Sequence, residues 1–266
     1  MMEFDADYTK YWSAAVLKSI DGSKIAGPIE IQQYLQNLEL KKDDLVLDLG
    51  CSYGRMFELL ASFSDHIFGV DPEQTALEMA RQMGYENLSQ GSAERTNMPD
   101  NFFDFIFSWA VFDVVKQLDA LFEANRILKL GGKLLFTAKN DNYYLDDRLA
   151  FVAEKNAFLK GFPNRFTNIS MLLENLPQLG LNLETLYLFP RRGDIGIGVF
   201  EECSVQNTEQ VLAYEYLIVC RKSLDVRFPV SGLKAIESEV SLTSRNLARE
   251  NGFSNVHKYF ESIGLN

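Results

Sequence analysis

Several residue types and patterns are scarce or absent in this 266-residue chain, and each absence excludes a class of protein. Three cysteines, odd in number and widely spaced, argue against a disulfide framework and against a metal cluster. Basic residues number 26 against 37 acidic ones, and a charge of −11 disfavours binding to a nucleic-acid backbone. No apolar run approaches the ~20 residues that span a bilayer, and the amino terminus lacks the pattern of a signal peptide. These absences predict a cytoplasmic globular protein without a metal.

Two apolar runs that each end in an acid carry most of the functional information. Residues 45–55 read LVLDLGCSYGR and residues 67–71 read IFGVD, which is typical of buried parallel strands. The turn Gly50–Gly54 follows the first run, where α/β sheets bind nucleotide-like ligands. Asp71 ends the second run, where a carboxylate is placed to accept hydrogen bonds from two ribose hydroxyls.

The glycine spacing separates two cofactor classes. A dinucleotide site needs G-x-G-x-x-G, but Ser52 and Arg55 stand where the second and third glycines belong. The chain reads D-x-G-x-x-x-G from Asp48 to Gly54, which resembles the first motif of class I S-adenosylmethionine (SAM)-dependent methyltransferases. Ser52 replaces the middle glycine of that motif, which predicts a turn backbone open to a residue with a side chain.

Two later segments strengthen the resemblance. Residues 91–115 contain GSAE, a Met-Pro pair and the run FDFIFS, and residues 121–138 read LFEANRILKLGGKLLFTA. Both are similar to passages of the same family in the same order, so that residues 45–138 match it as a whole. The resemblance is to the broad small-molecule group that includes the quinone-biosynthesis enzymes. It implies a methyltransferase that uses SAM as its cofactor.

The alternation of strand and helix patterns predicts an α/β fold with a doubly wound, mostly parallel sheet. The resemblance implies seven strands in a Rossmann-like order, with the last strand antiparallel. Strands are expected at 45–49, 67–71, 88–90, 103–108, 132–138, 183–189 and 211–220, and helices at 54–63, 73–83, 116–128, 143–160, 170–179, 233–249 and 256–263. We expect a helical cap at 1–44, the SAM-binding domain at 45–222 and a helical extension at 223–266.

The resemblance also implies which residues bind the cofactor, although several have a structural alternative. Asp71 could also cap the next helix, a role compatible with ribose binding, while Glu94 could equally be a surface acid and Trp109 could belong to the core. The expected cofactor-binding residues are Asp48, Gly50, Cys51, Ser52, Tyr53, Gly54, Asp71, Pro72, Ala93, Glu94, Ser108 and Trp109.

The acceptor side offers fewer candidates. Methyl transfer is largely a matter of positioning, and a hydroxyl acceptor needs a base. The two histidines, His66 and His257, lie away from the expected site. Asp113, in the loop after the fourth strand, is the candidate base, with a helix cap or a surface acid as the alternative. Tyr11 and Tyr143 are expected to line the acceptor pocket.

Arg191 and Arg192 follow the sixth strand and are able to grip a phosphate or carboxylate. The alternative is a surface pair balanced by nearby acids. On the first interpretation the acceptor is anionic, such as a nucleotide-linked precursor of a surface polysaccharide or secondary metabolite. Residues 1–30 and 190–210 are then expected to cover the acceptor pocket.

Two function classes stay open. The first is a SAM-dependent methyltransferase that acts on a small molecule, with oxygen as the acceptor atom. The second is a non-catalytic SAM-binding scaffold that acts through partners, with residues 223–266 as a possible homodimer contact. A nucleic-acid methyltransferase is disfavoured, because SWAV stands after the fourth strand in place of the motif of amino-directed DNA enzymes.

Overall fold

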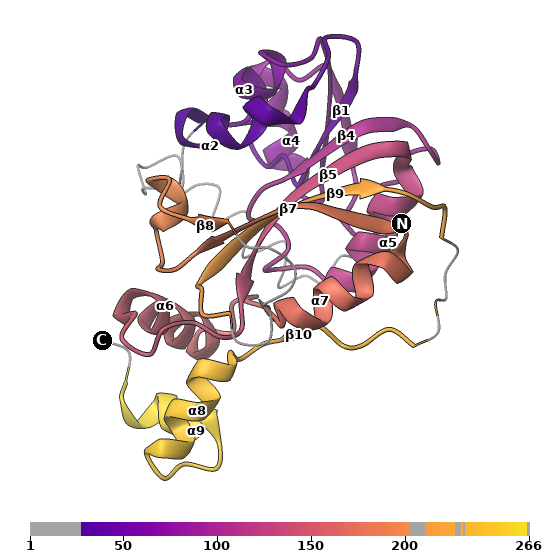
Figure 1. Cartoon of the computed structure of the whole chain (residues 1–266). Helices are drawn as coiled ribbons and strands as arrows, with labels where there is room; N and C mark the ends of the chain where they lie inside the picture. Colours follow the sequence, from indigo (N-terminus) through magenta and orange to yellow (C-terminus); the bar gives the residue numbers. More distant parts are fainter. Residues whose placement is uncertain (1–27, 203–210, 227–229, 231, 265–266) are drawn as a thin grey trace.

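The computed structural model of the chain describes residues 28–202, 211–226, 230 and 232–264. Its centre is a sheet in the order β3-β2-β1-β4-β5-β9-β7-β8 (Figure 1). The first five strands in this order are parallel, and β9 is antiparallel to both β5 and β7. The strands of this path are β1 (Leu45–Leu49), β2 (His66–Asp71), β3 (Asn87–Gln90), β4 (Phe103–Ser108), β5 (Leu128–Asn140), β7 (Leu181–Phe189), β8 (Glu201–Glu202) and β9 (Glu215–Lys222). The expected Rossmann-like α/β fold is confirmed.

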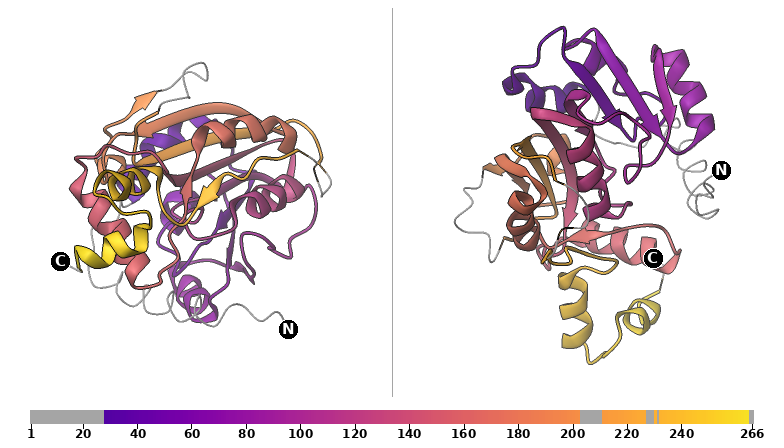
Figure 2. Two further views of the ribbon diagram at one scale, coloured as in Figure 1. Left: turned by 90° about the horizontal axis from the view of Figure 1, so that it is seen from below. Right: turned by 90° about the vertical axis from the view of Figure 1, so that its right-hand side faces the viewer.

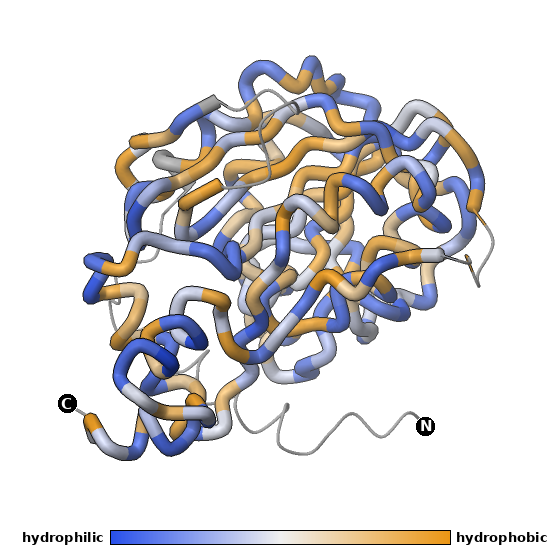
Figure 3. Tube along the Cα trace, turned by 60° about the horizontal axis from the view of Figure 1, so that its bottom comes forward, coloured by the Kyte–Doolittle hydropathy of each residue, from blue (hydrophilic) through white to orange (hydrophobic). Residues whose placement is uncertain are grey.

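Helices cover both faces of the sheet, because successive strand side chains point to opposite faces and the central strands carry apolar residues on both. In β4, Phe105 and Phe107 pack toward one face, whereas Phe103 and Ile106 pack toward the other. Figure 3 shows the apolar stretches concentrated along the strands. The first face is covered by α2 (Pro28–Leu35), α3 (Phe57–Ala61) and α4 (Gln74–Met83), and the second by α5 (Gln117–Ile127), α7 (Ile169–Asn175) and the 3₁₀ turn η2 (Leu176–Leu179).

A third group of helices gathers at the end of the molecule to which the carboxyl end of β5 leads (Figures 1 and 2). These are α6 (Arg148–Leu159), α8 (Leu242–Glu250) and α9 (Val256–Ser262). They share a small aromatic core in which Phe260 contacts Phe151 and Phe158. Each of the three helices is capped by a side chain, since Asp147, Ser241 and Asn255 each accept a hydrogen bond from a first-turn N–H. The extension is therefore packed onto the domain through α6.

The structure corrects several expected boundaries. Strand β5 is 13 residues long and begins before the Gly131–Gly132 pair instead of after it. Helix α6 begins at Arg148, where Asp147 caps it, and the segment from 143 to 147 is not helical. The strand expected from residue 211 begins at Glu215.

Short strands add to the seven that the resemblance implied. The pieces β6 (Phe166–Thr167) and β10 (Glu237–Ser238) pair with each other, and β6 also pairs with β5. The strand β10 replaces the first part of the helix expected from residue 233. Within the cap expected at 1–44, the described part holds α2 and the 3₁₀ turn η1 (Gln36–Leu38). In the part of the chain that the structure describes, none of the helices has the length and apolar character to cross a bilayer.

Candidate functional site

The turn after β1 is tied to the end of β2 by backbone hydrogen bonds. The N–H groups of Gly50 and Cys51 both donate to the carbonyl oxygen of Val70, at 2.8 and 3.1 Å. The next N–H, of Ser52, donates to Oδ2 of Asp71 at 2.9 Å. The turn and the acid at the end of β2 thus form one unit at the carboxyl edge of the sheet.

Both glycines of the turn are sterically required. Gly50 has φ +82°, and a Cβ there would lie 2.4 Å from Cγ2 of Val111, in the loop after β4. Gly54 has φ +86°, and its Cβ would lie 2.9 Å from Cα of Ala80. No side chain fits at either position. The motif brings the backbone of the turn close to the β4 loop and to α4.

Ser52, between the two glycines, is the other residue of the turn with a positive φ. Its φ of +49° lies in the left-handed region that favours glycine. The turn admits the serine, but in a backbone conformation that glycine adopts more readily. The expectation of a backbone suited to a side chain therefore holds only at the expense of local strain, a feature that concentrates at functional sites.

Asp71 is almost fully buried, and each of its carboxylate oxygens accepts a hydrogen bond from a backbone N–H group. Its Oδ2 accepts the Ser52 N–H, and its Oδ1 accepts the N–H of Glu73 at 2.9 Å. Burial raises the pKa of this carboxyl to about 6, although the two backbone bonds act in the opposite direction. The cap of α4 is Glu73, whose side chain accepts from Thr75, so the alternative of Asp71 as the helix cap is wrong. Each carboxylate oxygen has a second lone pair available for a ligand hydroxyl.

Asp48 is also buried. Two residues that the sequence did not indicate as its partners, Tyr85 and Arg55, affect the pKa of its carboxyl group. The hydroxyl of Tyr85 donates to Oδ2 of Asp48 at 2.5 Å. Burial raises the pKa of Asp48 to about 7, while the Tyr85 hydrogen bond and the positive charge of Arg55 lower it. Tyr85 lies just beyond α4 and 37 positions from Asp48, and no local pattern signals the pair.

The residues expected near the adenine lie after β3. Ala93 is buried, inside a short turn in which Ser92 and Arg95 exchange backbone hydrogen bonds of 3.1 Å. Oε1 of Glu94 accepts from the N–H of Lys116, the residue before α5, at 2.9 Å. This contact favours a structural role for Glu94, as a cap for that helix. Pro72 follows Asp71 at the same edge and is half-buried.

Ser108 and Trp109 end β4 beside the turn. The Ser108 hydroxyl is fully buried and donates to the carbonyl oxygen of Leu49 at 3.2 Å, so that it joins β4 to β1. The Trp109 ring stacks on Phe107 with an interplanar angle of 10° and lies 6.1 Å from the ring of Tyr34 in α2. With 8% of its surface exposed, Trp109 belongs mainly to the core that underlies the site.

Asp113, the candidate base, is paired with a lysine that sequence analysis missed. Oδ2 of Asp113 lies 2.6 Å from Nζ of Lys139, near the end of β5. The same Nζ donates to Oδ1 of Asn164 at 2.6 Å. Oδ1 of Asp113 is buried and has no hydrogen-bond partner among the described residues. Asp113 therefore presents one committed oxygen and one oxygen that is open to a further donor.

Other charged groups surround this pair. Lys139 lies opposite Glu215 in the antiparallel β5–β9 pairing. Burial raises the pKa of Glu215 to about 7, and the negative charge of Asp113 raises it further, against the positive charges of Lys139 and Arg192. Asp113 and the other nearby anions hold the pKa of Lys139 above its ordinary value despite burial. A protonated lysine thus stands between two carboxyl groups.

The remaining acceptor-side candidates lie apart from one another. Arg191 is held by Asp146 through two hydrogen bonds, at 2.6 and 3.0 Å, and its guanidinium lies 4.6 Å from the ring centroid of Tyr144. Arg192 has an exposed side chain close enough to affect Glu215. Tyr143 is fully buried, and its hydroxyl donates to Glu154 at 2.6 Å. The placement of Tyr143 indicates a structural role, and Tyr11 lies outside the described residues.

The donor set at the carboxyl edge fits the expected cofactor. Gly50 lets the backbone of the turn pack directly against Val111, and the Asp71 carboxylate keeps acceptor capacity for hydroxyls. The buried Asp48 carboxyl suits a cationic group, because an adjacent positive charge favours its ionised form. A strand-edge turn with two buried acids thus has the chemistry to hold a nucleoside with a charged amino acid end.

Comparisons with known proteins agree with this geometry. The sequence model of the family described as "Methyltransferase domain" matches residues 47–136. An uncharacterized protein of Methanocaldococcus jannaschii is 30% identical over 122 residues, 45% of this chain and 52% of that protein. A probable S-adenosylmethionine-dependent methyltransferase of Mycolicibacterium smegmatis is 26% identical over 151 residues, 56% of each chain. The chain thus spans about half the length of these curated relatives.

Solved structures share the fold over most of the chain. One is a SAM-dependent methyltransferase of Thermotoga maritima, described as a possible histamine N-methyltransferase. It has a TM-score of 0.55 and 20% identity, and the likeness covers 82% of this chain and 96% of that one. At this identity the likeness shows the fold.

Proposed function

We propose that this chain, in which residues 47–136 form a methyltransferase domain of the class I SAM-dependent type, transfers a methyl group from SAM to a small-molecule acceptor. The observation that carries the proposal is the unit formed by the Gly50–Gly54 turn and Asp71. It joins the family's first motif to the ribose-binding acid in one hydrogen-bonded structure. The substrate, the partners and the activity of the whole chain are parts of this proposal.

The chain's own residues bind and orient the reactants. Asp71 would accept the ribose hydroxyls, the Gly50–Gly54 turn would lie against the methionine end, and Asp48 would face the ammonium group. When bound, SAM supplies an electrophilic methyl group on a sulfonium sulfur. Val111, packed against Gly50, keeps the β4 loop over the turn and excludes water from this side of the site.

We assign proton removal from an acceptor hydroxyl to Asp113. Oδ1 of Asp113 would take up the proton of the acceptor hydroxyl as that oxygen receives the methyl group that SAM would supply. Lys139 holds the other carboxylate oxygen at 2.6 Å and thereby orients the group. The buried and unpartnered Oδ1 supports this assignment, as does its position in the loop that Val111 anchors to the turn. Oxygen as the acceptor atom follows from this role, since a base is needed there.

The structure lends the anionic-acceptor hypothesis limited support. Arg191 is committed to Asp146, so that of the two arginines Arg192 is the one whose exposed side chain is available to an acceptor. A phosphorylated or nucleotide-linked acceptor, such as a precursor of a surface polysaccharide or secondary metabolite, would therefore depend on Arg192. Cover by residues 1–30 and 190–210 stays a prediction, because 1–27 and 203–210 lie outside the described residues.

The alternative function is a SAM-binding scaffold without catalysis. In that case the extension, whose helices α8 and α9 pack onto α6, would contact the partners. A homodimer formed through residues 223–266 stays a separate prediction. A cytoplasmic location stays a prediction. Methyl transfer by the purified protein separates the two functions.

The test is isothermal titration with SAM, S-adenosylhomocysteine and NAD, followed by incubation with labelled SAM and a metabolite extract. We expect binding of the first two ligands only, and label in a small molecule. Preferential binding of NAD would overturn the cofactor assignment. SAM binding without label in any fraction would favour the scaffold.

A further inference from the structure

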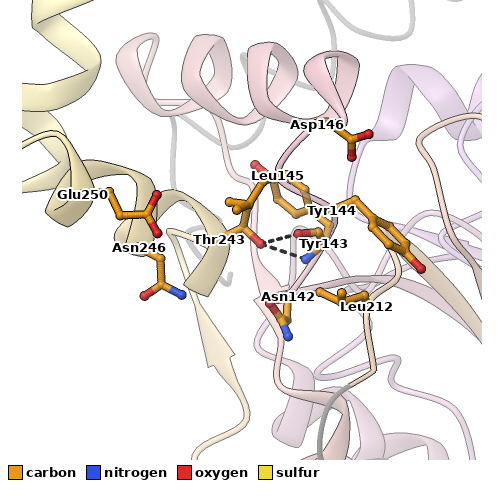
Figure 4. Close-up of a pocket in the computed structure, with 9 residues that line it drawn as sticks. All are labelled: Asn142, Tyr143, Tyr144, Leu145, Asp146, Leu212, Thr243, Asn246 and Glu250. Carbon is orange, nitrogen blue, oxygen red and sulfur yellow. Dashed lines mark hydrogen bonds between the residues drawn. The ribbon is translucent and has the colours of Figure 1, made fainter.

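An open pocket of about 400 Å³ lies between helix α8 and the segment that follows β5 (Figure 4). Asn246 and Glu250 form its wall on the α8 side, and Tyr144, Asp146 and Leu212 face them from the other side. Asn142, Tyr143, Leu145 and Thr243 complete the lining. The volume falls in the range of roughly 300–1,000 Å³ that is usual for small-molecule sites.

Hydrogen bonds hold the two walls together. Thr243 Oγ1 accepts from the N–H of Tyr143 and donates to its carbonyl oxygen, both at 2.8 Å (Figure 4). Behind this contact, the buried Glu154 accepts from the Tyr143 hydroxyl and from the side chains of Ser241 and Ser244. The pocket is therefore preformed, and ligand binding does not have to order its walls.

The lining combines apolar surface with negative charge. Leu145 and Leu212 are 56% and 42% exposed, an exposure that a ligand with an apolar body would reduce. The charged residues among the nine that line the pocket are Asp146 and Glu250, both acidic. Asp146 is held by Arg191, whereas Glu250 forms no ion pair with any residue that the structure describes. The guanidinium of Arg191 already lies over the Tyr144 ring, so the acid that is left for a ligand cation is Glu250, on the opposite wall.

The pocket is connected to the pair assigned to proton removal through buried side chains of the sheet. The ring of Tyr143 contacts the ring of Tyr214 at a centroid distance of 5.7 Å. Tyr214 precedes Glu215, which pairs with Lys139 across the sheet, and Lys139 binds Asp113. A chain of contacts therefore leads from the pocket to the candidate base at the carboxyl edge.

We propose that this pocket binds the methyl acceptor and that the acceptor is a small amine with an apolar ring or chain. Glu250 receives the ammonium group, and Leu145 and Leu212 cover the apolar body. The inference rests on the proposed function, and it names a substrate class opposite in charge to the one that Arg191 and Arg192 suggest.

Two probes of similar size test the charge preference, because tyramine and 4-hydroxyphenylacetate share a phenol ring and differ in the charge of the side chain. Binding is measured by calorimetry or ligand-observed NMR, with and without S-adenosylhomocysteine. We expect tyramine to bind at least tenfold more tightly. Asn246→Trp, which fills the pocket, should weaken tyramine at least tenfold. Glu250→Gln, an exposed change that leaves the fold intact, should weaken it about threefold.

The matched control is Leu149→Trp, because Leu149 is 66% exposed on α6 and does not line the pocket. It should bind tyramine as the wild type does. Equal binding of the two probes, tighter binding of the anion, or unchanged tyramine affinity in both Asn246→Trp and Glu250→Gln would overturn the amine site. SAM affinity is measured for every protein. Loss of the amine site alone leaves the proposed function standing, whereas pocket-dependent tyramine binding without SAM binding overturns the function and leaves the amine site.

Discussion

Ser241 donates two hydrogen bonds to Glu154, from its N–H to Oε1 at 2.8 Å and from its hydroxyl to Oε2 at 2.7 Å. The two residues are 87 positions apart, and both are buried. Ser241 caps α8 and Glu154 lies in α6, so this contact fastens the C-terminal helices to the helix that follows β5. The cap and the junction depend on the same carboxyl group.

Replacement of Glu154 should therefore destabilise α8 and α9 more than it destabilises the sheet. Glu154→Ala leaves the Ser241, Ser244 and Tyr143 donors without their acceptor, and we expect a loss of about 2–4 kcal/mol in the free energy of unfolding. Hydrogen exchange followed by mass spectrometry should show faster exchange in α8 and α9. Glu261→Ala, in an exposed pair with His257, is the control and should change little. Uniform exchange in the Glu154 variant would contradict the local role.

The steric requirement at Gly50 can be separated from its backbone conformation. Gly50 and Gly131 have nearly the same φ, +82° and +83°, but a Cβ at Gly131 meets nothing within 4 Å. Gly131→Ala should lose only about 1 kcal/mol of stability, from the left-handed backbone. Gly50→Ala adds the collision with Val111 and should lose about 1–3 kcal/mol more. Urea unfolding of both variants measures the difference, and equal losses would show that the β4 loop gives way freely.

Asp71→Ala should weaken SAM binding by about 1.5–3 kcal/mol, the range for hydrogen bonds to a charged group. Because Asp71 also accepts from Ser52 and Glu73, the variant should lose stability as well. Asp71→Asn keeps one acceptor oxygen and should retain more of both properties. Titration calorimetry and thermal unfolding are read together. An unchanged dissociation constant in the alanine variant would limit Asp71 to its backbone contacts.

The buried Asp48 predicts a pH dependence of stability. Its pKa is raised from the ordinary 3.8 to about 7, so that between these values the folded protein keeps a proton that the unfolded chain releases. The stabilisation from this proton is complete below pH 3.8 and is lost as the pH rises toward 7. Asp48→Asn should flatten that slope in urea unfolding between pH 4 and about 8. Asp65→Asn, at an exposed site, is the control and should keep the wild-type slope.

Asp113→Asn should lower kcat by about 10²–10⁴, the usual contribution of a general base, and leave the SAM dissociation constant unchanged. Asp119→Asn, an exposed change in the first turn of α5, should keep the wild-type rate. Labelled methyl transfer to whichever acceptor the screen identifies gives both rates. A wild-type kcat in the Asp113 variant would reduce Asp113 to the partner of Lys139.

The positions of the central strands and the cofactor turn could be predicted because they depend on neighbours in sequence, whereas the strand order came from the family resemblance. The apolar runs at 45–49 and 103–108 specify buried strands, and β1 and β4 have the expected ends. The predicted strand boundaries were wrong where pairing with a strand from another part of the chain determines where the strand begins. Strand β5 begins at Leu128, ahead of its two glycines, because Leu128 pairs with Phe103 of β4 before a register shift.

The sequence by itself therefore determined the α/β sheet, the Gly50–Gly54 turn and the place of Asp71. Only the tertiary structure decided which group each buried charge contacts. Tyr85 contacts Asp48, Lys139 contacts Asp113, and the first residues of α8 contact Glu154. The reason is physical. Hydrophobic periodicity and turn chemistry act over a few residues, whereas burial of a charge requires a partner that the folded chain brings from any distance.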